Sequence, residues 1–235
     1  MIKRSDILFA AGVFLLFLPF FMNEGLYDSY THLNHLHGFF MAFIKFAILA
    51  TLGEVIGLRI KTGKYTQPGF GVLPRAVVWG FLGVTIKFAF IVFASGTLSF
   101  LEYMGMQQAR AIFAGNLSAG RILVAFSIST AMNLIYAPVM MTLHKVTDTH
   151  ILTTGGTIRG LFTPIPFASI LKGLNWDVQW NFVFKKTIPF FWIPAHTITF
   201  LLPPDFRVLF AALLGIVLGI ILALANMKKT ENQTA

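Results

Sequence analysis

The chain has 235 residues, of which 56% are hydrophobic and 11% are charged, against roughly a quarter charged in ordinary soluble domains. This composition excludes a water-soluble globule and a disordered chain, and the absence of cysteine excludes disulfides and thiolate-ligated metal centres. The formal net charge is +9, but no basic run alternates with exposed aromatics, so we expect the lipid bilayer as a partner and no nucleic acid.

Apolar runs of about 20 residues cross the hydrocarbon core as helices. We therefore predict an all-α, polytopic transmembrane helix bundle, built as a single domain over residues 1–235 with six spans. The spans cover residues 7–22, 38–60, 72–98, 120–143, 187–202 and 208–226. No small-x-small cleavage site follows the first span, which favours an uncleaved anchor. The fifth contains Pro189 and Pro194, which predict an irregular helix.

The distribution of charge predicts the orientation of these spans. If the N-terminus is cytoplasmic, thirteen of the 18 Lys and Arg lie in inner segments, three in outer segments and two within spans. This bias places both termini in the cytoplasm. Residues 150–184 combine a flexible turn, prolines, and tryptophans beside lysines, which is typical of an interfacial cytoplasmic loop. No transit-peptide pattern is present, so we expect a multi-pass protein of the cell (inner) membrane of a bacterium.

Ionisable side chains inside spans are costly and are therefore the first candidates for function. Glu54, in the second span, is the only acid within a span, and Lys87 lies on the adjacent antiparallel helix. A Glu54–Lys87 pair would either fix the register of the two helices or line an aqueous path. Lys45, near the outer end of the second span, either extends its ammonium group to the interface or faces the same path.

Three more polar residues are candidates for a pore lining. Asn133 precedes Pro138 in the fourth span and can satisfy backbone groups that a proline frees. His196 lies in the broken fifth span, where irregular backbone must be packed in protein or face water. Arg207 follows that span, where it would either favour anions at an outer vestibule or pair with an acid at the headgroups.

A cluster of histidines precedes the second span. His32, His35 and His37 are candidate ligands for zinc, copper or iron. No metalloprotease spacing such as HExxH accompanies them, so a membrane metalloenzyme is the weaker alternative, and we expect neither a catalytic residue nor a cofactor.

Two GxxxG motifs, Gly53–Gly57 and Gly215–Gly219, let helix backbones approach closely. Packing within the chain and a homodimer through these helices explain the two motifs equally well.

The C-terminal part of the chain, from about residue 75 to residue 229, resembles the Mpv17/PMP22 family of small integral membrane proteins. The resemblance rests on Trp192-Ile193-Pro194-Ala195, Phe200, Pro203, Phe206, Arg207, Gly80-Phe81-Leu82-Gly83 and Ala137-Pro138. It would make this chain a bacterial-type member with two additional spans at its front. The resemblance implies channel-like passage of small solutes or a role in membrane homeostasis. We therefore expect a channel or carrier for a small solute, with a structural or assembly protein as the alternative.

Overall fold

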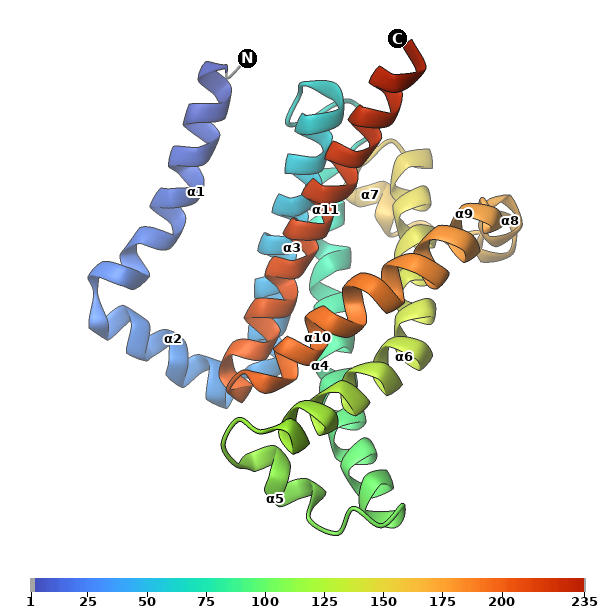
Figure 1. Cartoon of the computed structure of the whole chain (residues 1–235). Coiled ribbons are helices and arrows are strands. Elements are labelled where there is room, and N and C mark those ends of the chain that lie inside the picture. The colour runs from blue at the N-terminus through green and yellow to red at the C-terminus, as the bar shows by residue number, and fades with distance from the viewer. Residues whose placement is uncertain (1–2, 235) are drawn as a thin grey trace. The chain divides into compact units, whose positions relative to one another are not determined.

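The computed structural model describes residues 3–234, with the side chains of residues 3–221 except 16 and 21, and every regular element in this part of the chain is a helix (Figure 1). The elements are α1 (Arg4–Met22), α2 (Glu24–Leu36), α3 (Gly38–Thr62), α4 (Val72–Tyr103), α5 (Ala109–Ala114), α6 (Ala119–Thr153), α7 (Ile158–Leu161), α8 (Phe167–Gly173), α9 (Trp176–Val178), the π-helix η1 (Gln179–Trp192), α10 (Ile193–Leu201) and α11 (Pro204–Thr234). The predicted all-α architecture is confirmed.

Residue contacts divide the chain into two compact units, Met1–Met41 and Ala42–Ala235, where the sequence predicts one domain. In the first unit, α1 and α2 meet at Asn23, whose side chain accepts a hydrogen bond from the Leu26 amide at 3.0 Å. This N-cap begins a new helix instead of continuing α1, and the helix axes differ by 86°. The predicted first span corresponds to α1.

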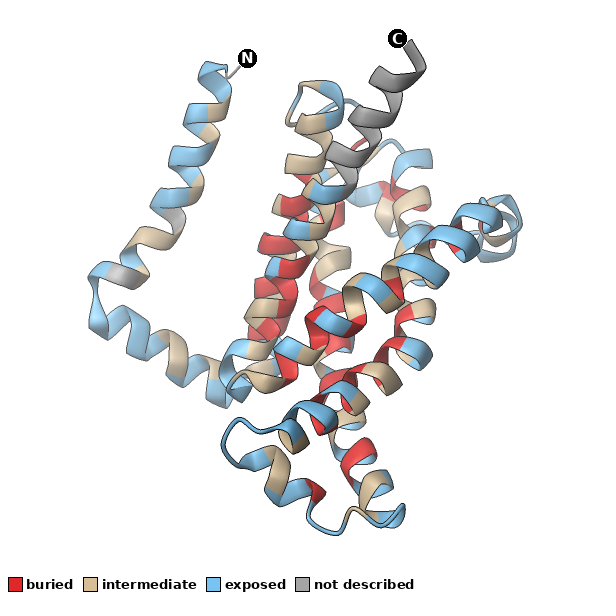
Figure 2. Ribbon diagram, in the orientation of Figure 1, coloured by how far each residue is buried: buried red, intermediate tan, exposed pale blue. Residues whose placement is uncertain are grey.

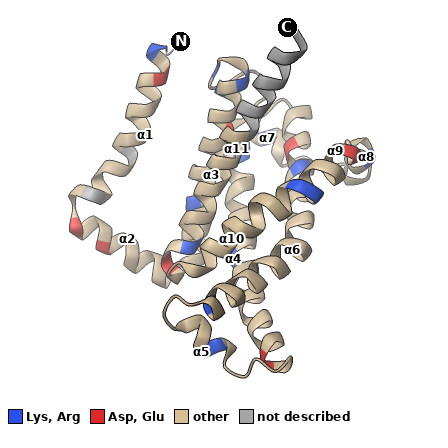
Figure 3. Cartoon of the chain, in the orientation of Figure 1, with Lys and Arg blue, Asp and Glu red and all other residues tan. Residues whose placement is uncertain are grey.

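In the described part of the chain, α3, α4, α6 and residues Pro204–Ile221 of α11 are long and apolar enough to cross a membrane. Charged side chains are sparse along them (Figure 3). These helices correspond to the predicted second, third, fourth and sixth spans and indicate a multi-pass membrane protein. The bent pair α1–α2 would add a fifth span, whereas η1 and α10, which cover the predicted fifth span, are not among the four. Six spans and two cytoplasmic termini stay predictions.

Several helices extend beyond the predicted ends of their spans. The 35 residues of α6 make it about 53 Å long at 1.5 Å per residue, against about 30 Å of hydrocarbon. Its last turns carry His144 and Asp148 past the predicted end at residue 143. Residues 150–184 form the end of α6, the short helices α7, α8 and α9 and the start of η1, where a loop was predicted.

The two GxxxG motifs meet each other inside the chain. A Cβ atom on Gly53 would lie 2.9 Å from the Cα of Ile216, and one on Gly219 would lie 3.4 Å from the Gly53 carbonyl oxygen. Because glycine has no side chain, the backbones of α3 and α11 come into direct contact at these positions. Of the two uses predicted for these motifs, the structure shows packing within the chain, and the homodimer stays a prediction.

Close packing also sets the register of α3 against α4. A Cβ atom on Gly83 would lie 2.5 Å from the Cβ of Phe46. The two helices are antiparallel (Figure 1), and in this register Arg75 on α4 contacts Glu54 on α3. Buried residues concentrate on the facing sides of α3, α4, α6 and α10 (Figure 2). The register of α3 against α4 thus brings Glu54 and Arg75 together.

Candidate functional site

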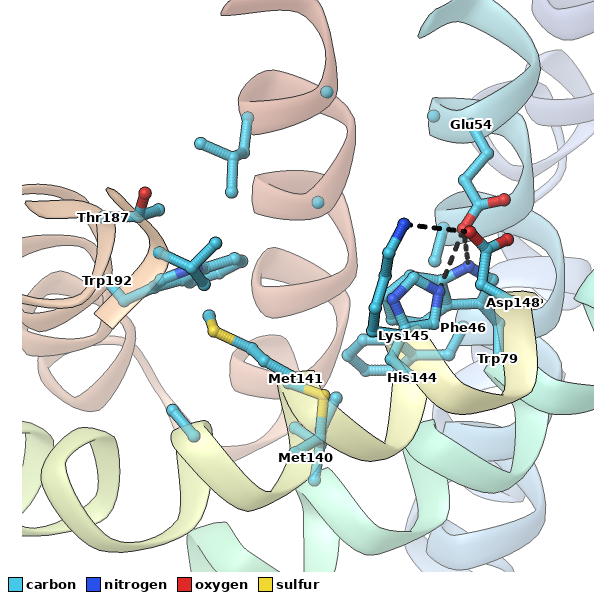
Figure 4. Close-up of a pocket in the computed structure, with 18 of the residues that line it drawn as sticks. Phe46, Glu54, Trp79, Met140, Met141, His144, Lys145, Asp148, Thr187 and Trp192 are labelled. Atoms are coloured by element: carbon cyan, nitrogen blue, oxygen red, sulfur yellow. Dashed lines mark hydrogen bonds and ion pairs between the residues drawn. The ribbon is translucent and has the colours of Figure 1, made fainter. Parts of the chain in front are cut away.

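A cavity of about 550 Å³ lies within the second unit, between α3, α4, α6, η1, α10 and α11 (Figure 4). Its volume falls in the range of small-molecule pockets, roughly 300–1,000 Å³. Most of its wall is apolar and includes Phe46, Met141 and Trp192. The charged residues that line it are Glu54, Lys61, Arg75, Lys145 and Asp148. A mostly apolar cavity with a few convergent polar groups is the usual form of a ligand site.

Arg75 is the centre of the charged cluster. It is 6% exposed, and its Nη1 contacts the carboxylates of both Glu54, on α3, and Asp148, on α6. Its Nε donates a hydrogen bond to the carbonyl oxygen of Phe70 at 2.7 Å, and its guanidinium lies 4.4 Å from the centre of the Phe70 ring. One guanidinium therefore ties three helices together and is held by the loop that precedes α4.

The second oxygen of Glu54 is bound by two more donors. Trp79 Nε1 donates to Glu54 Oε1 at 2.7 Å, and His144 Nε2 lies 3.1 Å from the same atom (Figure 4). The rings of Trp79 and His144 are in contact, with their centres 4.4 Å apart. Desolvating a carboxylate is costly unless its oxygens are paired. The cluster meets this requirement at Glu54 with side chains from α4 and α6.

Helical spacing explains how the sequence builds the cluster. Arg75 and Trp79 are four residues apart on α4, and His144 and Asp148 are four apart on α6, so each pair lies on one face of its helix. We did not predict these four residues. Arg75, His144 and Asp148 lie at or beyond the expected ends of spans, where charged residues are ordinary, and Trp79 lies inside the third span, where an aromatic side chain is ordinary. The two i,i+4 pairs opposite Glu54 are the signal that could have identified them.

The π-helix η1 forms one wall of the cavity. A π-helix closes its hydrogen bonds between residues i and i+5, so positions four or five apart share a face. Gln179, Val183, Thr187 and Trp192 follow this spacing, and all four line the cavity. Helices of this kind are rare and are frequently found at functional sites. The wide turn therefore presents a continuous row of side chains to the cavity.

Of the six predicted lining residues, Glu54, Asn133 and His196 line the cavity. Asn133 is 1% exposed and donates to the Ser129 carbonyl oxygen at 2.8 Å, while the Ser129 hydroxyl donates to the carbonyl oxygen of Ile193 at 2.8 Å. This chain of bonds joins α6 to α10, rather than satisfying the backbone near Pro138. His196 is buried and stacks on Trp192, with ring centres 5.3 Å apart.

Lys45 and Lys87 do not line the cavity, and the predicted Glu54–Lys87 pair is wrong. Asp205, at the start of α11, attracts both lysines, and the charge of Lys87 repels that of Lys45. The register of α3 against α4 is the reason. Lys87 lies eight residues beyond Trp79, or about 12 Å along α4, and so faces the beginning of α3.

Arg207 also lies outside the cavity lining. Its Nε donates to the Leu202 carbonyl oxygen at 3.0 Å and its Nη2 to that of Phe200 at 3.1 Å, while Arg121 Nη2 donates to Leu201 at 3.1 Å. The last carbonyl groups of a helix lack partners within it. The two arginines thus satisfy the end of α10, and this geometry gives no support to an anion filter at Arg207.

The histidine cluster does not form a metal site. His32 and His35 lie on α2, and His37 is its C-cap residue. His37 follows the last helical residue with φ −122° and ψ 46°, so it is outside the helical register of the other two. Among the residues whose side chains the structure describes, no group of three or more His, Asp or Glu side chains is arranged to hold a metal ion. The structure therefore does not bring the candidate ligands His32, His35 and His37 together around one point.

No protein family, curated protein or solved structure matches this chain. The resemblance to the Mpv17/PMP22 family stays a prediction. The class of protein that the fold and the cavity define is a multi-pass helical membrane protein with a partly charged internal cavity.

Proposed function

We propose that this chain is a channel or carrier that moves a small solute across a cell membrane, without catalysis. The observation that carries the proposal is the cavity of about 550 Å³ among helices long enough to cross a membrane. A bundle that serves only as a scaffold gains dispersion energy by filling such a space. In this chain the space is left open, and its mostly apolar wall also carries the charged cluster around Arg75.

The position of the ionisable residues supports the same proposal. Acids and bases inside membrane helices are expensive, and those that occur usually face a cavity or mark a solute path. Glu54 lies inside the predicted second span and lines the cavity, and its neighbours Arg75 and Asp148, at or beyond the ends of their spans, line it too. The Mpv17/PMP22 resemblance points the same way, and the cell membrane of a bacterium is the location that we propose.

A structural or assembly role is the second candidate. The cluster itself favours it, because Arg75 bridges Glu54 on α3 to Asp148 on α6 and so locks three helices together. In that case the cavity would be a packing defect without a ligand. The two candidates differ in whether filling the cavity matters, because a scaffold tolerates a filled cavity and a transporter does not.

Gly215 offers a direct way to fill the cavity. It lines the cavity, and a Cβ atom placed on it would meet nothing within 4 Å. Gly215→Trp therefore puts an indole into the space without displacing backbone. Gly96, on α4, is the matched control, because it also has open space around a Cβ atom but is exposed and lies outside the lining.

The experiment measures release of labelled urea, glycerol, lactate and glycine from proteoliposomes containing the purified full chain. We expect flux of at least one solute above that of protein-free liposomes, a loss of at least tenfold in Gly215→Trp, and wild-type flux in Gly96→Trp. If the wild-type protein releases none of the four solutes, the structural role is preferred. If Gly215→Trp is as active as Gly96→Trp, the cavity is not the path.

A further inference from the structure

The polar groups of the cavity differ in whether the protein already engages them. Both oxygens of Glu54 are bound, by Arg75 on one side and by Trp79 and His144 on the other. Asp148 contacts Arg75. Glu54 is thus fully engaged, whereas Asp148 is held by ion pairs alone, through Oδ1 to Arg75 and through Oδ2 to Lys145 at 3.9 Å. Lys61, Arg75 and Lys145 face only these two carboxylates, so the charged lining is net positive, which favours an anionic ligand over a cationic one.

Lys61 and Lys145, which also line the cavity, have fewer interactions within the protein than these two carboxylates. Lys145 lies 3.9 Å from Asp148, beyond hydrogen-bond distance, and its side chain is 54% exposed. Lys61 is exposed, and among the residues whose side chains the structure describes, no carboxylate lies within ion-pair distance of it. Because both lysines line the cavity and are exposed, they mark its opening.

Gln179 adds a donor that is already desolvated. The residue is 8% exposed and lines the cavity, and its Nε2 atom is buried without a hydrogen-bond partner. Because η1 packs on α6, Gln179 on η1 and Lys145 on α6 contribute to the wall of the same cavity. A buried donor without a partner is unfavourable, and a ligand oxygen would satisfy it.

Away from its charged residues, most of the cavity wall is apolar. Figure 4 shows Met140 and Met141 between Trp192 on one side and His144 on the other. Thioether and aromatic groups make a wall that adapts to an apolar ligand. A ligand that fits both parts has an oxygen-rich, negatively charged head and an apolar body.

We propose that the cavity binds an organic anion, with its carboxylate held by Lys61, Lys145 and Gln179 and its apolar body against Met141 and Trp192. Ammonium groups bind carboxylates by charge-assisted hydrogen bonds, which are about twice as strong as neutral ones. This assignment rests on the proposed function and names the class of solute for the same cavity.

The test compares three probes with the same ring system and different heads: 2-naphthoate, 2-naphthalenemethanol and 2-naphthylmethylammonium. Binding to the purified full chain in lipid nanodiscs is measured by equilibrium dialysis against empty nanodiscs, which corrects for partition into lipid. We expect 2-naphthoate to bind at least tenfold more tightly than the alcohol or the ammonium compound. Inorganic phosphate should compete weakly, because it lacks the apolar body.

Variants locate the site. Lys61→Gln/Lys145→Gln should weaken 2-naphthoate binding at least tenfold, whereas Lys64→Gln/Lys186→Gln, which removes two exposed lysines outside the lining, should change it less than twofold. Gln179→Glu keeps the shape, removes the donor and adds negative charge, so it should also abolish 2-naphthoate binding.

Two results would overturn the assignment. One is tighter or equal binding of the ammonium compound or the alcohol, and the other is an equal effect of the cavity and control lysine pairs. The flux assay separates this proposal from the proposed function. Flux that Gly215→Trp blocks, without a preference for 2-naphthoate, refutes only the anion site. Specific 2-naphthoate binding with no flux refutes only transport.

Discussion

Replacement of Arg75 by methionine tests what the charged cluster contributes to stability. The guanidinium contacts both Glu54 and Asp148 and is 6% exposed. Arg75→Met therefore leaves two neighbouring carboxylates in a largely buried site without their cation. Removing one member of a buried ion pair costs about 3–5 kcal/mol. Glu54→Gln should cost only about 1–2 kcal/mol, because Arg75 keeps Asp148 and the new amide oxygen still accepts from Trp79.

The experiment measures thermal unfolding of the purified chain in lipid nanodiscs. The readout is either a probe that binds only the folded protein or the loss of monodisperse particles. In a chain of this length, 1 kcal/mol corresponds to about 2–4 °C, so Arg75→Met should lower the melting temperature by about 6 °C or more. The triple variant Glu54→Gln/Arg75→Met/Asp148→Asn removes every formal charge of the trio and should recover most of that loss. A melting temperature within about 2 °C of wild type for Arg75→Met, or a triple variant less stable than Arg75→Met alone, would refute this reasoning.

Two further substitutions test the packing of the bundle. Gly53→Ala should destabilise the chain by about 1–3 kcal/mol, because the new Cβ would lie 2.9 Å from the Cα of Ile216; Gly96→Ala, with open space around it, should be neutral or stabilising by up to about 1 kcal/mol. Equal effects in the same unfolding assay would show that α3 and α11 are not in tight contact. Arg207→Gln should cost about 1.5–3 kcal/mol through its lost bonds to the end of α10 and leave solute flux unchanged, whereas altered anion preference with unchanged stability would favour a filter at Arg207.

Composition and hydropathy already determine the class of this protein. Apolar runs of sufficient length predict helices that cross a membrane, and four such helices lie where they were predicted. Glu54, Asn133 and His196 are recognisable as cavity candidates from the sequence, because a polar side chain at hydrophobic depth requires a partner or water. The two GxxxG motifs are equally visible, since close approach of helices depends on small side chains at that spacing.

The pairings, in contrast, depend on the register between helices. Sliding α4 along α3 by two turns would pair Glu54 with a different residue, yet it would leave the hydropathy of each helix unchanged. The contact of Gly83 with Phe46 sets the register that places Arg75, and not Lys87, beside Glu54. The continuation of α6 past residue 143, which brings His144 and Asp148 to the cavity, is likewise a tertiary effect. A helix end beyond the hydrocarbon is stabilised by the partners that it meets there, and these partners come from other parts of the chain.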